Sequence, residues 1–386
     1  MTAEAEQREG RAQAGRFEVR ARDAETDARC GVLQTAHGPV HTPVFMPVGT
    51  QATVKGMTPR ELEELRIEII LGNTYHLSER PGAEVIERLG GLHAFMGWNG
   101  AILTDSGGYQ VFSLASLREV TEDGVRFRSH VDGAERFLGP DEAMEIQRRL
   151  GSDIAMAFDE CPPDPSDRDY TCKAVQRTLD WAVRCARAPR AEGQIVFGIV
   201  QGGIFSDLRE ECAGRLADLG FDGYAIGGVS VGEGEELITR GVEDTARHLP
   251  PHRPRYLMGV GDPAQIVDAV ARGVDMFDCV MPTRLARNGT VMTRRGRYPV
   301  KAGRFRTDPA PLEEECGCEV CARFSRAYIR HLFNTNEMLG PRLVTEHNLQ
   351  VYGRLQEEMR THIEAGTYAS FARSFAAEYR GVRDDL

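Results

Sequence analysis

The sequence predicts an α/β protein organised as a (β/α)8 barrel, and three observations support this prediction. Eight short apolar runs lie between residues 44 and 282, most of them followed by glycine and polar residues. Stretches with helical character lie between the runs, and continuous apolar strands that alternate with helices are typical of a parallel sheet. The length of 386 residues accommodates such a barrel with additions. An open doubly wound sheet is the alternative, because one spurious strand among the eight would favour it.

The expected strands are short and mostly apolar, as buried parallel strands are. In chain order they are VFMPV (44–48), IEIILG (67–72), AILTD (101–105), IAMAFD (154–159), IVFGIVQ (195–201), YAIGG (224–228), RYLMGVG (255–261) and MFDCVMP (276–282). Helices are expected between them, because apolar residues recur at i, i+3 and i+4 in 141–151, 174–188 and 262–273. Segments 106–140 and 282–306 are longer than ordinary connections, so we expect them to decorate the barrel mouth.

Cysteine usage and hydropathy indicate a reducing, cytoplasmic compartment. The nine cysteines are an odd number, and no apolar stretch is long enough for a signal peptide or a membrane span. Both observations argue against a secreted disulfide scaffold. Residues 1–16 are polar and poor in β-branched side chains, which predicts a disordered tail.

One segment carries a charge opposite to that of the whole chain. Residues 282–306 contain eight basic residues and no acidic one, although the net charge of the chain is −11. Charge runs are usually solvated faces. A strip this one-sided on an acidic protein, with Tyr298 and Phe305 interleaved, is better explained as a track for a polyanion. We interpret it as a nucleic-acid contact.

The ends of the expected strands predict a polar barrel mouth, because reactive groups in such barrels follow the carboxyl ends of the strands. Two amides, Asn73 and Gln201, and several glycines stand there, together with four carboxylates, Asp105, Asp159, Glu160 and Asp278. Paired carboxylates suit displacement at an anomeric carbon with retention, in which one is the nucleophile and the other the acid and then the base. Asp105 and Asp278 end well-separated strands and are the candidate pair. The alternative is that each only caps a loop.

The stretch CGCEVC (316–321) predicts a metal site. Cys316, Cys318 and Cys321 supply three thiolates, and tetrahedral zinc needs one more ligand, for which the candidates are His331, His347 and His362. A site with three cysteines and one histidine is closed to water and substrate. It also lies outside the eight strand units, so we expect the metal to be structural.

Several motifs together resemble those of the bacterial-type tRNA-guanine transglycosylases, the queuine tRNA-ribosyltransferase family. The resemblance runs from about residue 17 to the C-terminus, with the motifs in family order. They are HTPVFMPVGTQATVKGM (41–57), GNTYHL (72–77), TDSGGYQVFS (104–113), FDECPP (158–163), GIVQGG (198–203), GYAIGGVSVGEG (223–234), YLMGVG (256–261), FDCVMPTRLARNG (277–289) and the cysteine cluster.

The resemblance implies a base exchange at the wobble position of tRNA with a G-U-N anticodon, in which a deazaguanine replaces guanine during queuosine biosynthesis. It implies a TIM barrel with a zinc-binding insertion near the C-terminal end, and a homodimer. Residues 17–386 would form one catalytic domain that includes the basic strip and the zinc-binding subdomain at 282–350. The fourth ligand of one structural zinc ion would be His347, with His331 as the second choice.

The resemblance also implies roles for individual residues. Asp278 would be the nucleophile that holds a covalent ribosyl intermediate, and Asp105 the general acid and base. Asp159 would accept from the N1–H and 2-amino group of guanine, while Gln201 and the Gly228 backbone meet its carbonyl edge. The remaining contacts would be Tyr109 and Met258 on the two faces of the purine, Ser106 beside Asp105, and Arg284 and Arg287 on the RNA.

The small base preQ1 is the expected incoming base, because Cys161 and Val231 resemble the bacterial type and a β-branched Val231 leaves little room for the cyclopentenediol of queuine. Val229 and Ser230 depart from the Leu-Ala pair common in bacterial members. A queuine-inserting enzyme and a catalytically inactive tRNA-binding subunit are the alternatives. A zinc-dependent nucleobase hydrolase is disfavoured, since no H-x-H or HExxH motif occurs.

Overall fold

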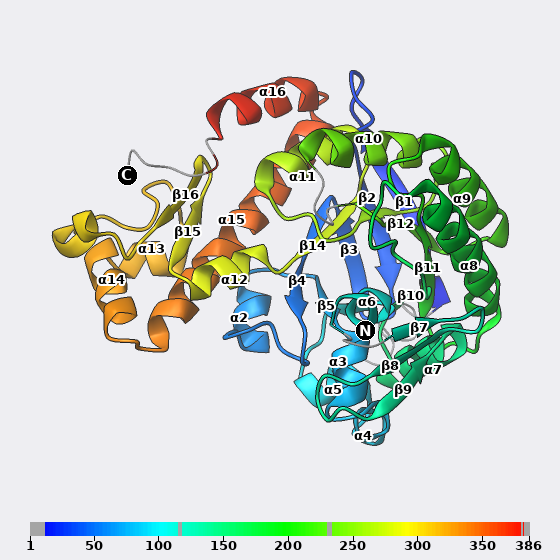
Figure 1. Ribbon diagram of the computed structural model, residues 1–386. Coiled ribbons are helices and arrows are strands. Elements are labelled where there is room, and N and C mark those ends of the chain that lie inside the picture. Colours follow the sequence, from blue (N-terminus) through cyan, green and yellow to red (C-terminus); the bar gives the residue numbers. More distant parts are fainter. Residues whose placement is uncertain (1–11, 115–117, 230–233, 380, 382–386) are drawn as a thin grey trace.

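A closed barrel of eight parallel strands forms the centre of the computed structural model (Figure 1). The structure describes residues 12–114, 118–229, 234–379 and 381. Around the barrel the strands are β4 (Val44–Gly49), β5 (Ile69–Gly72), β6 (Ala101–Thr104), β10 (Ile154–Met156), β11 (Ile195–Val200), β12 (Gly223–Ile226), β13 (Arg255–Leu257) and β14 (Met276–Cys279). Pairing of β14 with β4 and of β6 with β10 closes the ring. The predicted barrel is confirmed, and the open-sheet alternative is wrong.

Side chains of the barrel strands alternate between the interior and the surrounding helices. In β11, Ile195, Phe197 and Ile199 join the inner apolar cluster, whereas Val196 and Val200 pack in the outer cluster beneath the helices. This alternation follows from the two-residue period of a strand. A residue two positions beyond the last inner side chain therefore points into the mouth, where the loops begin.

Helices cover the outside of the barrel (Figure 1). The larger ones are α7 (Pro140–Leu150), α8 (Arg168–Arg187), α9 (Ser206–Leu219), α10 (Glu235–Ala246), α11 (Pro263–Ala271), α15 (Leu339–Glu364) and α16 (Tyr368–Glu378). The helices predicted at 141–151, 174–188 and 262–273 are confirmed as α7, part of α8 and α11. The helix α15 packs on β4, where Tyr352 and Phe45 have ring centroids 4.3 Å apart. It thus occupies the place of the eighth barrel helix.

Short helices and three small sheets complete the described part of the chain. The short helices are α2 (Pro59–Glu64), α3 (Thr74–Glu79), α4 (Ala83–Arg88), α5 (Gly91–Met96), α6 (Gly108–Leu114), α12 (Met281–Arg287), η1 (Gly303–Thr307), α13 (Glu319–Arg323) and α14 (Arg326–Asn334). The small sheets are β1 (Phe17–Arg22), β2 (Arg29–Thr35) and β3 (Gly38–Thr42); β7 (Arg118–Val120), β8 (Val125–Arg128) and β9 (Glu135–Leu138); and β15 (Thr290–Thr293) and β16 (Gly296–Pro299). The long segments 106–140 and 282–306 thus carry sheets of their own outside the barrel.

The region between β14 and α15 has a separate apolar core beside the barrel (Figure 1). Tyr298 and Phe305 lie in this core, with 0% and 2% of their surface exposed. The expectation that these two aromatic rings face a nucleic acid along the basic strip is therefore wrong, because both are buried in this core.

At the N-terminus, residues 1–11 lie outside the described residues. The expected tail extended to residue 16, yet the Gly15 N–H donates to the Gln34 carbonyl at 3.0 Å and the Arg16 carbonyl accepts from the Gln34 N–H at 2.9 Å. The folded part thus begins before residue 17. Among the described residues, no helix combines the length and the apolar character needed to cross a membrane.

Candidate active site and metal centre

The carboxyl ends of the strands bring the predicted polar residues together. Asp278 lies two positions after Met276, and Asp105 two positions after Leu103; both preceding residues belong to the inner apolar cluster. Strand alternation therefore turns both carboxylates into the mouth. The two are close enough for the charge of Asp278 to raise the pKa of Asp105. The expectation that they face one another agrees with this coupling.

Two donors hold one oxygen of the half-buried Asp278. The Tyr256 hydroxyl donates to Oδ1 at 2.6 Å, and the Gly259 N–H donates to the same atom at 2.8 Å. Gly259 has φ +73°, a backbone conformation that glycine adopts without strain. Burial raises the pKa of Asp278, and these two hydrogen bonds oppose that rise. Tyr256 had no assigned role in the sequence, although it stands in the YLMGVG motif.

Several donors hold the buried carboxylate of Asp105. The Thr74 N–H donates to Oδ1 at 2.8 Å, and the side-chain amides of Asn73 and Gln110 both donate to Oδ2, the latter at 3.0 Å. Asn73 is fixed in turn, because its own oxygen accepts from the His76 N–H as the N-cap of α3. Burial, more than the charge of Asp278, raises the pKa of Asp105 to about 7. A carboxyl group that titrates near neutrality can both give and take a proton.

A second polar cluster surrounds Asp159. Ser106 donates to its Oδ1 at 3.1 Å and the Gln201 amide to its Oδ2 at 2.7 Å, while burial raises its pKa to about 6. The Gln201 oxygen is buried and has no hydrogen-bond partner among the residues that the structure describes. A Cβ on Gly228, whose φ is +61°, would lie 2.4 Å from that oxygen. The motif glycine therefore keeps space free beside an unused acceptor.

Glu160 does not join the mouth, and its inclusion among the four mouth carboxylates is wrong. Its side chain is fully buried and pairs with Arg177 of α8 at 2.5 Å, and it accepts from the Tyr170 hydroxyl at 2.7 Å. The strand β10 ends at Met156, so its alternation does not extend to residue 160. Glu160 instead anchors the loop to α8.

The other predicted base-contacting residues occupy different environments. Tyr109 is 54% exposed at the start of α6, and Met258 packs at the edge of the inner cluster. Cys161 is half-buried in the loop after β10. Val229 is buried in the outer cluster, where its side chain packs on α10, so any contact it makes with a base is through its backbone. Ser230 and Val231 lie outside the described residues.

Arg209 links two of the mouth loops and was missed by the sequence analysis. Its guanidinium is buried and donates to the carbonyls of Gly203 at 2.7 Å, Gly227 at 3.1 Å and Gly228 at 3.0 Å. An arginine within an amphipathic helix gives no signal of such a role. Its five donors allow one side chain to fix the loops after β11 and β12 together.

The basic strip offers two cations one helical turn apart, on the helix that follows the strand of Asp278. Arg284 and Arg287 are exposed on α12, the helix that follows β14, and neither forms a salt bridge within the described ranges. Burial and the charge of Arg284 lower the pKa of Arg287. Arg294 of the same strip is instead used internally, through Glu358 and the Phe375 ring. Only part of the strip is thus free for a partner.

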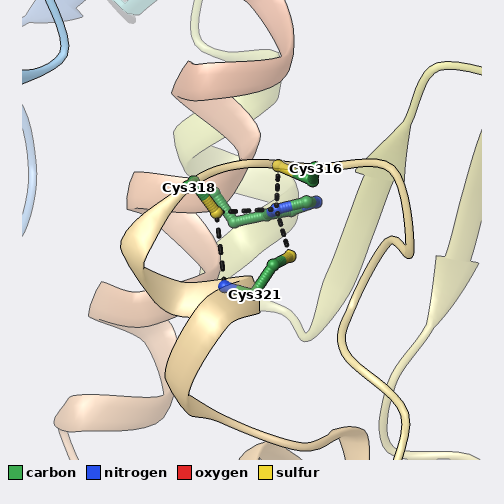
Figure 2. A group of neighbouring side chains, drawn as sticks. Cys316, Cys318 and Cys321 are labelled. Atoms are coloured by element: carbon green, nitrogen blue, oxygen red, sulfur yellow. Dashed lines mark hydrogen bonds between the residues drawn. The ribbon is translucent and has the colours of Figure 1, made fainter.

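The predicted zinc ligands converge in one cluster, with the three labelled cysteines of Figure 2 around one imidazole. The Sγ atoms of Cys316, Cys318 and Cys321 lie 3.7, 3.6 and 3.4 Å from Nδ1 of His347. Tetrahedral zinc would separate sulfur from nitrogen by about 3.6 Å. Nε2 of His347 donates to the Met292 carbonyl at 2.8 Å, which leaves Nδ1 free to bind a metal. The residues therefore fit a metal ion.

A second group of metal-binding residue types has another use. His37 and His93 stack with ring centroids 3.5 Å apart, and their ring nitrogens lie 2.8 and 3.1 Å from the carboxylate of Asp153. The Ile102 N–H donates to the same carboxylate at 2.8 Å. The contacts with these histidines lower the pKa of Asp153 to about 2. This cluster is a hydrogen-bonded tie at the amino-terminal end of the barrel.

Comparison with known proteins identifies the relatives of the chain. A family model described as queuine tRNA-ribosyltransferase matches residues 23–381. The queuine tRNA-ribosyltransferase of Caldanaerobacter subterraneus is 54% identical over 371 residues, covering 96% of this chain and 99% of the relative. That of Pelotomaculum thermopropionicum is 55% identical, covering 95% and 99%. That of Staphylococcus aureus is 52% identical, covering 92% and 94%.

Proposed function

Because the chain belongs to the queuine tRNA-ribosyltransferase family, we propose that it replaces guanine by preQ1 at the wobble position of tRNA with a G-U-N anticodon. The observation that carries the chemistry is the pair of electrostatically coupled carboxylates, Asp105 and Asp278, at the barrel mouth. Asp278 is held by two donors that favour its anion, and Asp105 titrates near pH 7. Retaining displacement needs such a pair.

The exchange proceeds in two displacements. Asp278 attacks C1′ of the nucleotide while the C1′–N9 bond breaks, and protonated Asp105 supplies the proton with which guanine leaves as a neutral base. The incoming preQ1 then attacks C1′ through N9, the bond from C1′ to Asp278 breaks, and Asp105 accepts the N9 proton. Each displacement inverts C1′, so the exchange retains its configuration.

Asp159, Gln201 and Gly228 form the base pocket. The Asp159 carboxylate accepts from N1–H and the 2-amino group, a donor pair shared by guanine and preQ1. Its pKa of about 6 leaves it mostly ionised at neutral pH. Gln201 turns from Asp159 to the carbonyl edge when a base enters, and the space beside Gly228 permits this turn. Tyr109 and Met258 stack on the purine, and Cys161 and Ser106 complete the wall.

The RNA is held beside the pocket by Arg284 and Arg287. An anticodon loop presents unstacked bases, so the target guanine reaches the mouth without opening of a duplex. Arginine contacts to phosphate position the strand, while the pocket specifies the base. The enzyme acts in the cytoplasm, where tRNA is modified, as a homodimer.

Cys316, Cys318, Cys321 and His347 hold one structural zinc ion. Four protein ligands leave no open position, so the ion stabilises the fold of 282–350 and takes no part in base exchange. Residues 17–386 then act as one catalytic domain, with this region as a subdomain.

The test is incorporation of labelled guanine into unmodified tRNA with a G-U-N anticodon. Wild-type protein should incorporate label and form a tRNA adduct that survives denaturation, Asp278→Asn should do neither, and Asp218→Asn on the exposed face of α9 should match wild type. Competition between preQ1 and queuine for that reaction identifies the incoming base. A wild-type protein that binds tRNA but exchanges no guanine would instead be a tRNA-binding subunit.

A further inference from the structure

The two hydrogen bonds at Asp278 are unevenly distributed. Tyr256 and Gly259 both donate to Oδ1, and no hydrogen bond to Oδ2 is formed within the described part of the chain. On the basis of the proposed function, we propose that Tyr256 is a positioning residue that fixes Oδ1 and thereby assigns the attack on C1′ to Oδ2. This placement affects both displacements, the attack of Asp278 on C1′ and the later release of the ribose from Asp278.

The tyrosine is held rigidly enough for this role. It is 1% exposed, and its ring belongs to the inner apolar cluster of the barrel. Tyr256 of β13 pairs in register with Met276 of β14, two positions before Asp278. Its hydroxyl therefore reaches the carboxylate from the barrel interior. Burial and the charge of Asp278 raise the pKa of Tyr256 well above its usual value, so the hydroxyl keeps its proton and remains a donor.

The charges around Asp278 make these donors important. The titratable groups that share its environment with Tyr256 are Asp105, just after β6, and the Cys279 thiol, next to Asp278 on β14. Arg284 of α12 acts on that thiol. No lysine or arginine forms an ion pair with Asp278 among the described residues. The anion is therefore stabilised mainly by the hydroxyl and the peptide N–H.

The same donors act differently in the two displacements. When Oδ2 bonds to C1′, Oδ1 becomes the carbonyl oxygen of an ester and keeps only partial negative charge. When the ester breaks, full charge returns to the carboxylate, and donors placed in advance stabilise it. Tyr256 therefore favours release of the ribose from Asp278 more than it favours attack.

Tyr256→Phe tests the proposal, because it removes the hydroxyl and preserves the ring. At fixed tRNA and guanine concentrations, we expect the fraction of enzyme trapped as covalent tRNA adduct to rise several-fold. The kcat for guanine exchange should fall about ten- to a hundredfold, the range for a hydrogen bond to a charged group. KM for tRNA should change less than about twofold. The acidic limb of the pH profile should move to higher pH, since Asp278 loses a donor that favours its anion.

Tyr224→Phe is the matched control. Tyr224 is equally buried, at 1% exposure, but lies on β12 with its ring in the outer cluster and its hydroxyl 3.5 Å from the Ala217 carbonyl. It should leave the adduct fraction and the pH profile unchanged. An adduct fraction and an acidic limb in Tyr256→Phe that match wild type would overturn the proposal.

A second test uses the wild-type protein and does not depend on a variant. In a crystal structure of the trapped adduct, the ester carbonyl oxygen should accept from Tyr256 and Gly259. The proposal is wrong if the bridging oxygen occupies that place. Failure of the proposed function is distinguishable, because wild-type protein would then form no adduct and exchange no guanine.

Discussion

Asp105 and Asp278 end strands that are three places apart around the barrel, and the charge of Asp278 raises the pKa of Asp105. Burial contributes the larger part of that rise and brings the pKa of Asp105 to about 7, although the amide donors at both oxygens lower it. At neutral pH about half of the Asp105 side chains carry a proton. Asp105 can therefore both give and take a proton beside Asp278, as two sequential displacements require.

Asp105 should lower the stability of the protein as pH rises. Its folded pKa of about 7 exceeds the ordinary 3.8, so the folded state binds the proton more tightly and the free energy of unfolding falls from about pH 4 to about pH 7. Between pH 5 and 8 the loss from this group is about 2–3 kcal/mol. The free energy of unfolding, measured with urea at pH 5 and at pH 8, should fall between these pH values by about 2–3 kcal/mol less in Asp105→Asn than in wild type. Equal decreases in both proteins would contradict the assigned shift.

Gly228→Ala should impair base binding specifically. The added Cβ would meet the Gln201 oxygen at 2.4 Å, and φ is +61°. We expect KM for guanine to rise at least about tenfold, which corresponds to about 1.4 kcal/mol. Gly220→Ala separates the two causes, because φ there is +73° but nothing lies within 4 Å of the added atom. A comparable rise of KM in Gly220→Ala would show that backbone strain alone explains the loss.

Removal of the metal should destabilise the region after β14. We expect one zinc per chain by elemental analysis, and loss of it in Cys318→Ser with a decrease of at least about 3 kcal/mol in the free energy of unfolding. Cys172→Ser, which changes an exposed thiol on α8, should keep the zinc and the stability. Full zinc content in Cys318→Ser would refute the ligand assignment.

Arg284→Ala should weaken tRNA binding and leave base binding intact. The side chain is exposed on α12, which follows β14, and forms no ion pair within the described ranges. Loss of one phosphate contact should raise KM for tRNA several-fold and reduce the steepness of its salt dependence by about one unit. Arg187→Ala, at the far end of α8, should change neither. An unchanged salt dependence in Arg284→Ala would remove this residue from the RNA contact.

The barrel and most of the site could be predicted because both depend on local patterns. Continuous apolar runs identify buried parallel strands, and the residue that follows each run identifies the mouth. Asp105, Asp159 and Gln201 were found in this way, and the cysteine spacing located three of the four candidate metal ligands, whereas the choice of His347 rested on the family resemblance.

The remaining features depend on contacts between distant segments. The hydrogen bond from Tyr256 to Asp278 follows from the register between two strands, which no single stretch encodes. Tyr298 and Phe305 have the same spacing whether they face RNA or a core. Only the packing of the folded chain shows that they lie in a core. Glu160 follows an apolar run like its neighbour Asp159, but the early end of β10 turned it toward α8.

The helix α15 also bears on the order in which the protein folds. His347 and Tyr352 on this helix bond the Met292 and Gly261 carbonyls, and Gln356 bonds the N–H of Phe45 in β4. The outer face of the first barrel strand is therefore covered by a helix whose contact residue, Gln356, lies 311 positions after Phe45. This apolar face stays uncovered until α15 has been synthesised. Covering of the barrel through a contact this distant in the sequence is thus expected to be a late step of folding.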